Sequence, residues 1–267
     1  TTEIYTLSLH DALPISPRLA HAPARGARTR PSENRIAMEA LIEYSPSLLA
    51  GAWVTLQIAL LSVLLAVATG LLGAACKLSG FLPLRLWTML YTTLVRGVPD
   101  LVMMMLVFYG GQLLLNEALD RLGWDFIEID PFVAGVLTIG FIFGAYFTET
   151  FRGAFLAVSA GQLEAGRAYG MSGWQVFRRI LFPQMLRFAL PGIGNNWLVL
   201  LKSTAIVSLI GLSDMTRVAD QAGRATHQPF TFYLAVCVLY LALTALSGHV
   251  LGRLTKRYSA GVREAHI

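Results

Sequence analysis

Long apolar runs separated by polar stretches predict five membrane-spanning helices. The first run, residues 48–76, carries no charge and exceeds the roughly 20 residues that a bilayer core requires. The second run, residues 83–115, is broken at Pro99, which predicts either a kinked helix or an interfacial helix followed by a short span. Three more runs follow at residues 132–151, 192–212 and 230–251. The pattern indicates an all-α, polytopic membrane protein.

The overall composition supports this fold class. The 267 residues are 55% hydrophobic and 14% charged, whereas soluble domains are usually about 25% charged. Residues 1–37 do not share this apolar character, and they lack the order of a secretory signal, namely a basic start, an apolar core and a small-residue cleavage site. We therefore expect residues 1–37 to be a disordered or artefactual leader, with residues 38–267 forming the transmembrane domain.

The positive charges predict the orientation of the chain, because cytoplasmic loops are enriched in Lys and Arg. One side of the predicted bundle collects eleven such residues: Lys77, Arg85, Arg152, Arg167, Arg178, Arg179, Arg187, Arg253, Lys256, Arg257 and Arg263. The other side collects only Arg121, Arg217 and Arg224. We expect the N-terminus outside, the C-terminus inside and the polar loop at residues 157–187 in the cytoplasm.

The sequence gives no sign of catalysis within this polypeptide. The phosphate-binding pattern GxxxxGK[ST] is absent, and no group of His, Cys or carboxylates has metal-ligand spacing. Cys76 and Cys237 lie in separate apolar segments, which favours buried thiols over a disulfide. The modest positive charge is too small for a nucleic-acid binder. We expect a non-catalytic membrane subunit that binds no metal or cofactor and contacts lipid.

The polar loop contains a segment rich in small residues. Residues 164–183 read EAGRAYGMSGWQVFRRILFP, and eight of the fourteen residues from 160 to 173 are Ala, Gly or Ser. Small side chains allow the backbone of a partner to approach closely. A helix over residues 161–170 would place Glu164, Ala168 and Met171 on one face. Such a short, thin helix is suited to a groove on another protein.

The same segment resembles a known pattern. It reads EA-small, three residues, Gly, nine residues, Ile, one residue and a hydrophobic residue followed by Pro, and it is carried by Glu164, Ala165, Gly166, Gly170, Ile180, Phe182 and Pro183. The pattern is that of the cytoplasmic coupling loop in permease subunits of ATP-binding-cassette importers. Gly166 replaces the third small residue of that pattern and Phe182 replaces its Leu.

Other segments narrow the resemblance to the polar amino-acid branch of these permeases. They are YTTLVRGVPDLV at 91–102, GAYFTETFRGAF at 144–155 and LPGIGNNWLVLLKSTAIVSLIGLSD at 190–214. The chain is most similar to histidine/lysine/arginine/ornithine and opine permeases, over residues 38–267. The resemblance implies a five-helix type I importer permease in the bacterial inner membrane.

The resemblance also implies partners. They are a cytoplasmic ATPase dimer that uses ATP and Mg, a second permease subunit that is identical or a sister chain, and an extracytoplasmic solute-binding protein. Glu164, Ala165, Gly166, Ala168 and Gly170 would seat in a groove of the ATPase. Arg178 and Arg179 would add basic contacts, and Pro183 would end the element before the fourth span.

Ionisable groups inside the spans are candidates for a solute pathway, because each costs at least about 2.5–3.5 kcal/mol at a helix centre unless it finds a partner or water. Lys202 lies in the fourth span, with Asn195 and Asn196 upstream. These three residues predict either a polar strip lining a pathway or, for Lys202, a structural ion pair with a carboxylate on another helix.

Three further charges allow two interpretations each. Glu149 lies three residues before Arg152 on one helix face, so the two either neutralise each other or leave Glu149 to contact solute. Arg96 and Asp100 flank the break at Pro99, and a broken helix at membrane depth lies either buried in protein or along a cavity.

Two other functions stay open for the chain. Charges along a pathway also fit an autonomous channel or ion-coupled transporter, and the polar loop alone fits a membrane scaffold that recruits soluble partners.

Overall fold

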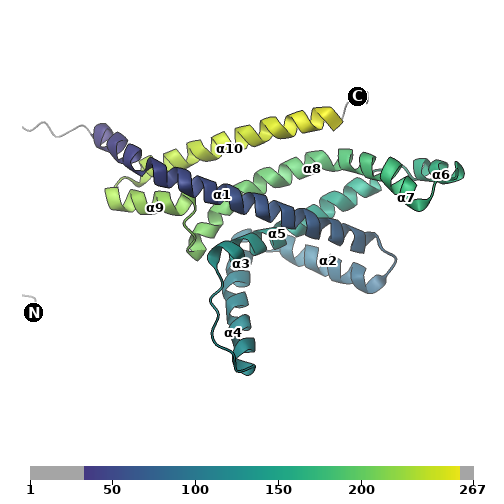
Figure 1. Cartoon of the computed structure of the whole chain (residues 1–267), viewed down its shortest axis with the longest axis horizontal. Coiled ribbons are helices and arrows are strands. Elements are labelled where there is room, and N and C mark those ends of the chain that lie inside the picture. Colours follow the sequence, from purple (N-terminus) through teal and green to yellow (C-terminus); the bar gives the residue numbers. More distant parts are fainter. Residues whose placement is uncertain (1–32, 259–267) are drawn as a thin grey trace, which may run out of the picture.

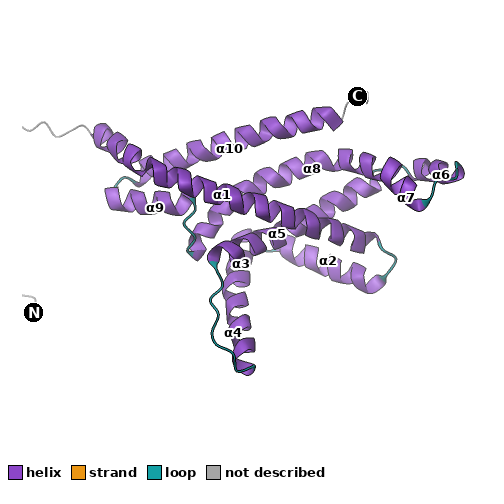
Figure 2. Ribbon diagram, in the orientation of Figure 1, coloured by secondary structure: helices purple, strands orange, loops and turns teal. Residues whose placement is uncertain are grey.

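The computed structural model describes residues 33–258, and within this range every regular element is a helix (Figure 2). The first helix, α1 (Glu33–Leu78), begins before Met38. Most of the expected leader, residues 1–32, lies outside the described part of the chain. A helix of this length exceeds the width of a bilayer core, so its first turns lie beyond the apolar run that starts at residue 48.

Five helical segments are long and apolar enough to cross a membrane, as the sequence predicts. They are Ala37–Leu78, Asp100–Arg121, Pro131–Leu156, Gly173–Ile210 and Pro229–Tyr258. Helix α1 begins at one end of the bundle and α10 (Pro229–Tyr258) ends at the other, as an odd number of crossings requires (Figure 1).

The second apolar run forms separate helices. Helix α2 (Leu82–Gly97) ends where Val98 adopts extended backbone, and Pro99 precedes α3 (Asp100–Met105). Proline disfavours helix in the residue before it, which explains the break. A π-helical turn, η1 (Leu106–Gly110), joins α3 to α4 (Gly111–Arg121), and α4 points away from the other helices (Figure 1). The sequence left open a kinked helix or a helix followed by a span, and the structure has the second arrangement.

Helix α5 (Pro131–Leu156) is the centre of the bundle and packs along α1. Two glycines allow this close approach. A carbon added to Gly70 of α1 would stand 2.5 Å from the Phe147 Cβ atom, and one added to Gly140 of α5 would stand 2.5 Å from the Leu65 Cδ2 atom. Small residues at helix contacts let backbones approach within a membrane. The buried core of α5 includes Ile139, Ile142, Phe143 and Phe147.

The last third of the chain closes the bundle. Helix α8 (Phe182–Ser203) packs on α5 and continues as the 3₁₀ turn η3 (Thr204–Ile210). Helix α9 (Met215–Thr226) follows, with Asp214 capping its N-terminus, and packs against α1 and α10. Met215, Ala219 and Phe232 belong to a second buried cluster between these helices.

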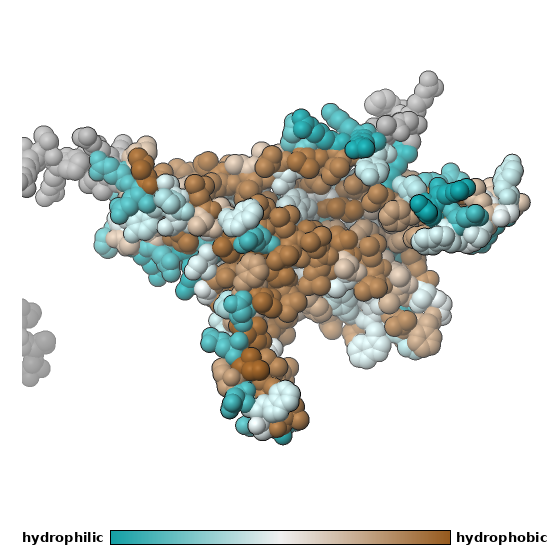
Figure 3. All heavy atoms as spheres, viewed as in Figure 1, coloured by the Kyte–Doolittle hydropathy of each residue, from teal (hydrophilic) through white to brown (hydrophobic). Residues whose placement is uncertain are grey.

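The surface agrees with a membrane setting. In Figure 3 apolar residues cover the middle of the visible face, and polar residues gather toward its ends. Exposed apolar side chains include Leu64, Leu72, Trp87, Leu106, Leu113 and Leu241. Since water would not favour this exposure, the sides of the bundle face lipid or other membrane subunits.

Candidate functional site: a projecting loop and an intramembrane ion-pair network

The polar loop forms a projection beyond the bundle. Helix α6 (Ala160–Ala168) and the short α7 (Gly173–Val176) lie past the ends of α5 and α8 (Figure 1). Glu164, Ala165 and Ala168 of α6 are exposed, whereas Gly166 is buried. The small-residue surface that the sequence predicts is therefore open to a partner.

Helix α6 ends at Ala168, and the chain turns at Gly170, whose backbone is left-handed. The Met171 N–H donates to the Gly166 carbonyl at 3.1 Å, and the Gly170 N–H donates to the Arg167 carbonyl at 2.9 Å. These two bonds form a Schellman motif, in which Gly170 has φ +79°. The expected helix over residues 161–170 is thus too long at its C-terminus, and Met171 leaves the face of Glu164 and Ala168.

Gly166 lies where α6 packs against the π-helical turn η2 (Phe177–Leu181). A carbon added to Gly166 would stand 2.6 Å from the Ile180 Cδ1 atom, 3.4 Å from the Val176 Cγ2 atom and 3.6 Å from the Met171 Sδ atom. The glycine that departs from the family pattern is therefore packed against the Ile of the same pattern. This contact holds α6 at a fixed angle to the following turns.

Side-chain hydrogen bonds cap the next helix of the loop. Ser172 caps α7: its hydroxyl accepts from the Gln175 N–H at 3.3 Å, and the Gln175 side chain accepts from the Ser172 N–H at 2.8 Å. Arg178 and Arg179 of η2 are exposed, as basic contacts for a partner would require. Tyr169 and Trp174 are exposed aromatic side chains of the same loop, and the position of Trp174 in a small, polar segment is the signal from which sequence analysis could have found it.

Pro183 does not end the element, contrary to the sequence prediction. It lies in the first turn of α8, directly after η2, and the chain is helical from Gly173 to Ile210. The π-helical turn precedes the proline, and the Phe182 N–H donates to the Phe177 carbonyl five residues back, so the hydrogen-bond pattern is already shifted where Pro183 supplies no N–H.

Glu149 of α5 is the centre of an ion-pair network. The predicted pairing with Arg152 is present, with the Arg152 Nε–H donating to Glu149 Oε2 at 2.9 Å. The Lys77 ammonium of α1 donates to the other carboxylate oxygen and to the Thr92 hydroxyl of α2. Sequence reasoning used Lys77 only for orientation. Its position at the end of a charge-free span was the available signal.

The polar strip expected on α8 divides between two faces. The Asn196 amide donates to the Thr150 hydroxyl of α5 at 3.0 Å, so Asn196 faces the interior of the bundle. Asn195 and Lys202 are exposed and lie seven residues apart, on the outer face. The correction follows from helical geometry, because adjacent residues point about 100° apart. The structural ion pair considered for Lys202 is absent among the residues that the structure describes.

Arg96 lies over the aromatic ring of Tyr146 on α5. The Arg96 guanidinium lies 5.5 Å from the ring centroid, a cation–π distance. The break at Pro99 therefore leaves Arg96, at the end of α2, packed against α5.

Comparison with known proteins shows the family of this chain. Residues 66–259 match the family described as "Binding-protein-dependent transport system inner membrane component". The chain belongs to this family. It is thus a multi-pass permease of the bacterial inner membrane, and the match covers the projecting loop and the Glu149 network.

Curated relatives place this permease among amino-acid transporters. It is 55% identical to the histidine/lysine/arginine/ornithine transport system permease protein HisQ of Salmonella typhimurium, over 85% of this chain and 100% of the relative. It is 45% identical to the nopaline transport system permease protein NocQ of Agrobacterium fabrum, over 80% of this chain and 91% of the relative.

Solved structures have the same fold. The permease matches a chain in a crystal structure of an amino acid ABC transporter with a TM-score of 0.71 and 32% identity, over 82% of this chain and 97% of that one. A chain of the methionine ABC transporter MetNI matches with a TM-score of 0.63 and 17% identity, over 79% and 95% of the two chains, which concerns the fold alone. The expected all-α importer permease fold is confirmed.

Proposed function

We propose that this permease moves basic amino acids or opines into the cell, driven by a separate cytoplasmic ATPase dimer that grips α6. The chain covers the whole length of a relative named for histidine, lysine, arginine and ornithine, and most of one named for nopaline. The second permease half is a copy or a sister chain, and an extracytoplasmic binding protein delivers the solute. ATP and Mg act on the ATPase.

One observation carries the coupling role, namely the exposed small-residue surface of α6 on a braced projection. Glu164, Ala165 and Ala168 are open, whereas Gly166 is packed against Ile180. A partner that grips the open side can therefore pass a displacement through η2 into α8, because packed elements transmit movement while mobile loops do not.

The distribution of charge supports the cytoplasmic assignment. Segments at the α6 end of the bundle, including the C-terminal end of α10, hold the larger set of Lys and Arg residues (Figure 1). The ATP-using partner is expected on that side. Exposed apolar surfaces on α4 and α10 support further membrane subunits or lipid as neighbours.

The test replaces Ala165 with Arg. The substitution adds bulk to the open surface, and the backbone stays helical because arginine has a high helix propensity. We expect Ala165→Arg to weaken co-purification of the ATPase and ATP-dependent arginine uptake by about tenfold or more, the effect of 1.4 kcal/mol. Uptake is measured in proteoliposomes that contain the co-expressed ATPase, permease partner and binding protein. Gly170→Arg should also lower both, through strain at the left-handed residue that ends α6 as well as through added bulk.

The matched control is Ala225→Arg, the same change on an exposed residue of α9 at the other end of the bundle. It should leave ATPase co-purification unchanged. Normal co-purification and uptake in Ala165→Arg would show that α6 is not the docking element. Uptake without any ATPase would instead identify a channel or an ion-coupled transporter.

A further inference from the structure

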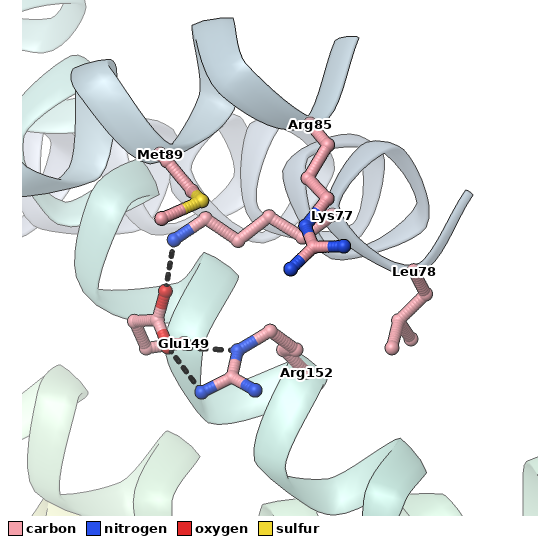
Figure 4. A pocket seen from close by; sticks show the side chains of 6 residues that line it. All are labelled: Lys77, Leu78, Arg85, Met89, Glu149 and Arg152. Carbon is pink, nitrogen blue, oxygen red and sulfur yellow. Dashed lines mark hydrogen bonds and ion pairs between the residues drawn. The ribbon is translucent and has the colours of Figure 1, made fainter. Parts of the chain in front are cut away.

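A cationic pocket lies between α1, α2 and α5, at the end of the bundle from which α6 projects (Figures 1 and 4). It has a volume of about 270 Å³ and is lined by Lys77, Leu78, Arg85, Met89, Glu149 and Arg152. Water occupies roughly 30 Å³ in the liquid, so the pocket has room for a phosphate group with some of its hydration.

The charges of the pocket do not balance. Three cations face one carboxylate, which leaves a net charge of +2. Glu149 is shared by Lys77 and Arg152, and the Lys77 side chain is only 10% exposed. Arg85 has no ion pair with any residue in the range 33–258. In Figure 4 the Arg85 side chain extends from α2 toward the space between Lys77 and Arg152, whereas the Arg152 guanidinium is turned toward Glu149. The pocket is therefore electropositive and suited to an anionic group.

The surroundings of the pocket are apolar. Leu78 and Met89 line its wall, and the exposed Phe81 and Leu82 lie on the turn into α2 and at the start of α2. Long Lys and Arg side chains near helix ends reach toward the membrane–water interface. A ligand that fits both parts carries an anionic head and an apolar body, and basic pockets between helices at an interface bind anionic lipid headgroups.

We propose that this pocket binds the phosphate diester of an anionic phospholipid in the leaflet on the α6 side. Arg85 and Arg152 contact the phosphate with their free N–H groups, while Lys77 adds positive potential from behind. Arginine suits this role because its planar fork matches phosphate oxygens. The bound lipid joins α2 to α5 near the start of the projecting loop.

The test measures lipid binding to the purified full-length chain by native mass spectrometry, with phosphatidylglycerol and phosphatidylcholine as probes. We expect the native chain to retain phosphatidylglycerol in preference to phosphatidylcholine. Arg85→Gln should weaken phosphatidylglycerol binding about fivefold, as the loss of one interfacial arginine implies. Arg85→Lys should weaken it less, because it keeps the charge.

The matched control is Arg253→Gln, which removes an exposed arginine of α10 at the same end of the bundle but outside the pocket. It should leave binding unchanged. Unaltered binding in Arg85→Gln, or an equal loss in both variants, would overturn the site. Displacement of the lipid by an equal concentration of inorganic phosphate would make free phosphate the ligand and overturn the lipid assignment.

Discussion

Gly166 and Ile180 stand in contact, so that a side-chain carbon on the glycine would lie 2.6 Å from the Ile180 Cδ1 atom. Both residues belong to the pattern that marks the coupling loop. The contact explains how α6, in which most residues are small, packs against η2. It also makes the orientation of α6 sensitive to the volume at these two positions.

We expect a measurable coupling between Gly166→Ala and Ile180→Val. Alanine gains up to about 1 kcal/mol of helix propensity over glycine, but its methyl group meets Ile180, and overpacking costs roughly 1–3 kcal/mol. Valine removes the Cδ1 atom. Gly166→Ala should therefore be more favourable in the Ile180→Val background, as measured by hydrogen exchange of the α6 amides.

The control is Gly161→Ala, whose added carbon has only Ser159 nearby, at 3.8 Å. Its effect on hydrogen exchange should be the same with Ile180 and with Ile180→Val. Simple additivity at Gly166 and Ile180 would contradict the contact.

Neutralising Glu149 should destabilise the bundle. In Glu149→Gln the Lys77 ammonium loses its carboxylate. Because the two side chains are partly buried, at 10% and 20% exposed, the loss should lie between the about 0–1 kcal/mol of an exposed pair and the about 3–5 kcal/mol of a buried one. The free energy of unfolding is measured in detergent by titration with sodium dodecyl sulfate. Adding Lys77→Met should restore much of the loss, because no unpaired ammonium then remains.

The control for this prediction is Glu117→Gln, which breaks the exposed pair with Arg121 on α4. Exposed pairs contribute about 0–1 kcal/mol, so the change should be small. Equal effects of Glu149→Gln and Glu117→Gln would show that the network does not stabilise the fold.

The sequence predicts features that depend on local pattern. A charge-free length sets the first span, and Pro99 ends α2 through its own backbone restriction. The Lys77–Glu149 pair joins residues 72 positions apart, so it depends on the packing of α1 on α5 and has no local signal. The wrong assignments at Met171 and Pro183 concern helix ends, where a left-handed Gly170 and a π-helical turn decided the outcome. Asn196 shows the same limit, because composition does not specify which helix face meets a neighbour.

Asp214 should make stability depend on pH. Its buried carboxylate accepts from the Thr216 and Arg217 N–H groups, each at 3.1 Å. Burial nevertheless raises the pKa of Asp214 above its ordinary value of 3.8. A raised pKa means that folding favours the protonated form, so stability is greatest below 3.8 and is lost as the pH rises through the folded pKa. Asp214→Asn retains a capping side chain and does not titrate. The melting temperature of Asp214→Asn minus that of the native chain should therefore be larger at about pH 7 than at about pH 4.

Asp214→Ala is the comparison for the capping role, and it should lose about 1 kcal/mol of the free energy of unfolding that Asp214→Asn retains. A constant difference between Asp214→Asn and the native chain across this pH range would show that the carboxylate does not titrate differently in the folded state.

Lys202 should matter for transport and not for folding. It lies exposed on α8 with Asn195 on the same face, and it has no ion pair within residues 33–258. Lys202→Met therefore leaves no carboxylate of this described range unpaired, and the variant should insert and melt like the native chain. If Lys202 lines the solute pathway, ATP-dependent uptake should fall by about tenfold, which corresponds to about 1.4 kcal/mol in the barrier. Lys202→Arg, which keeps the charge, should retain more uptake than Lys202→Met. Equal uptake by the native chain and Lys202→Met would place Lys202 outside the pathway.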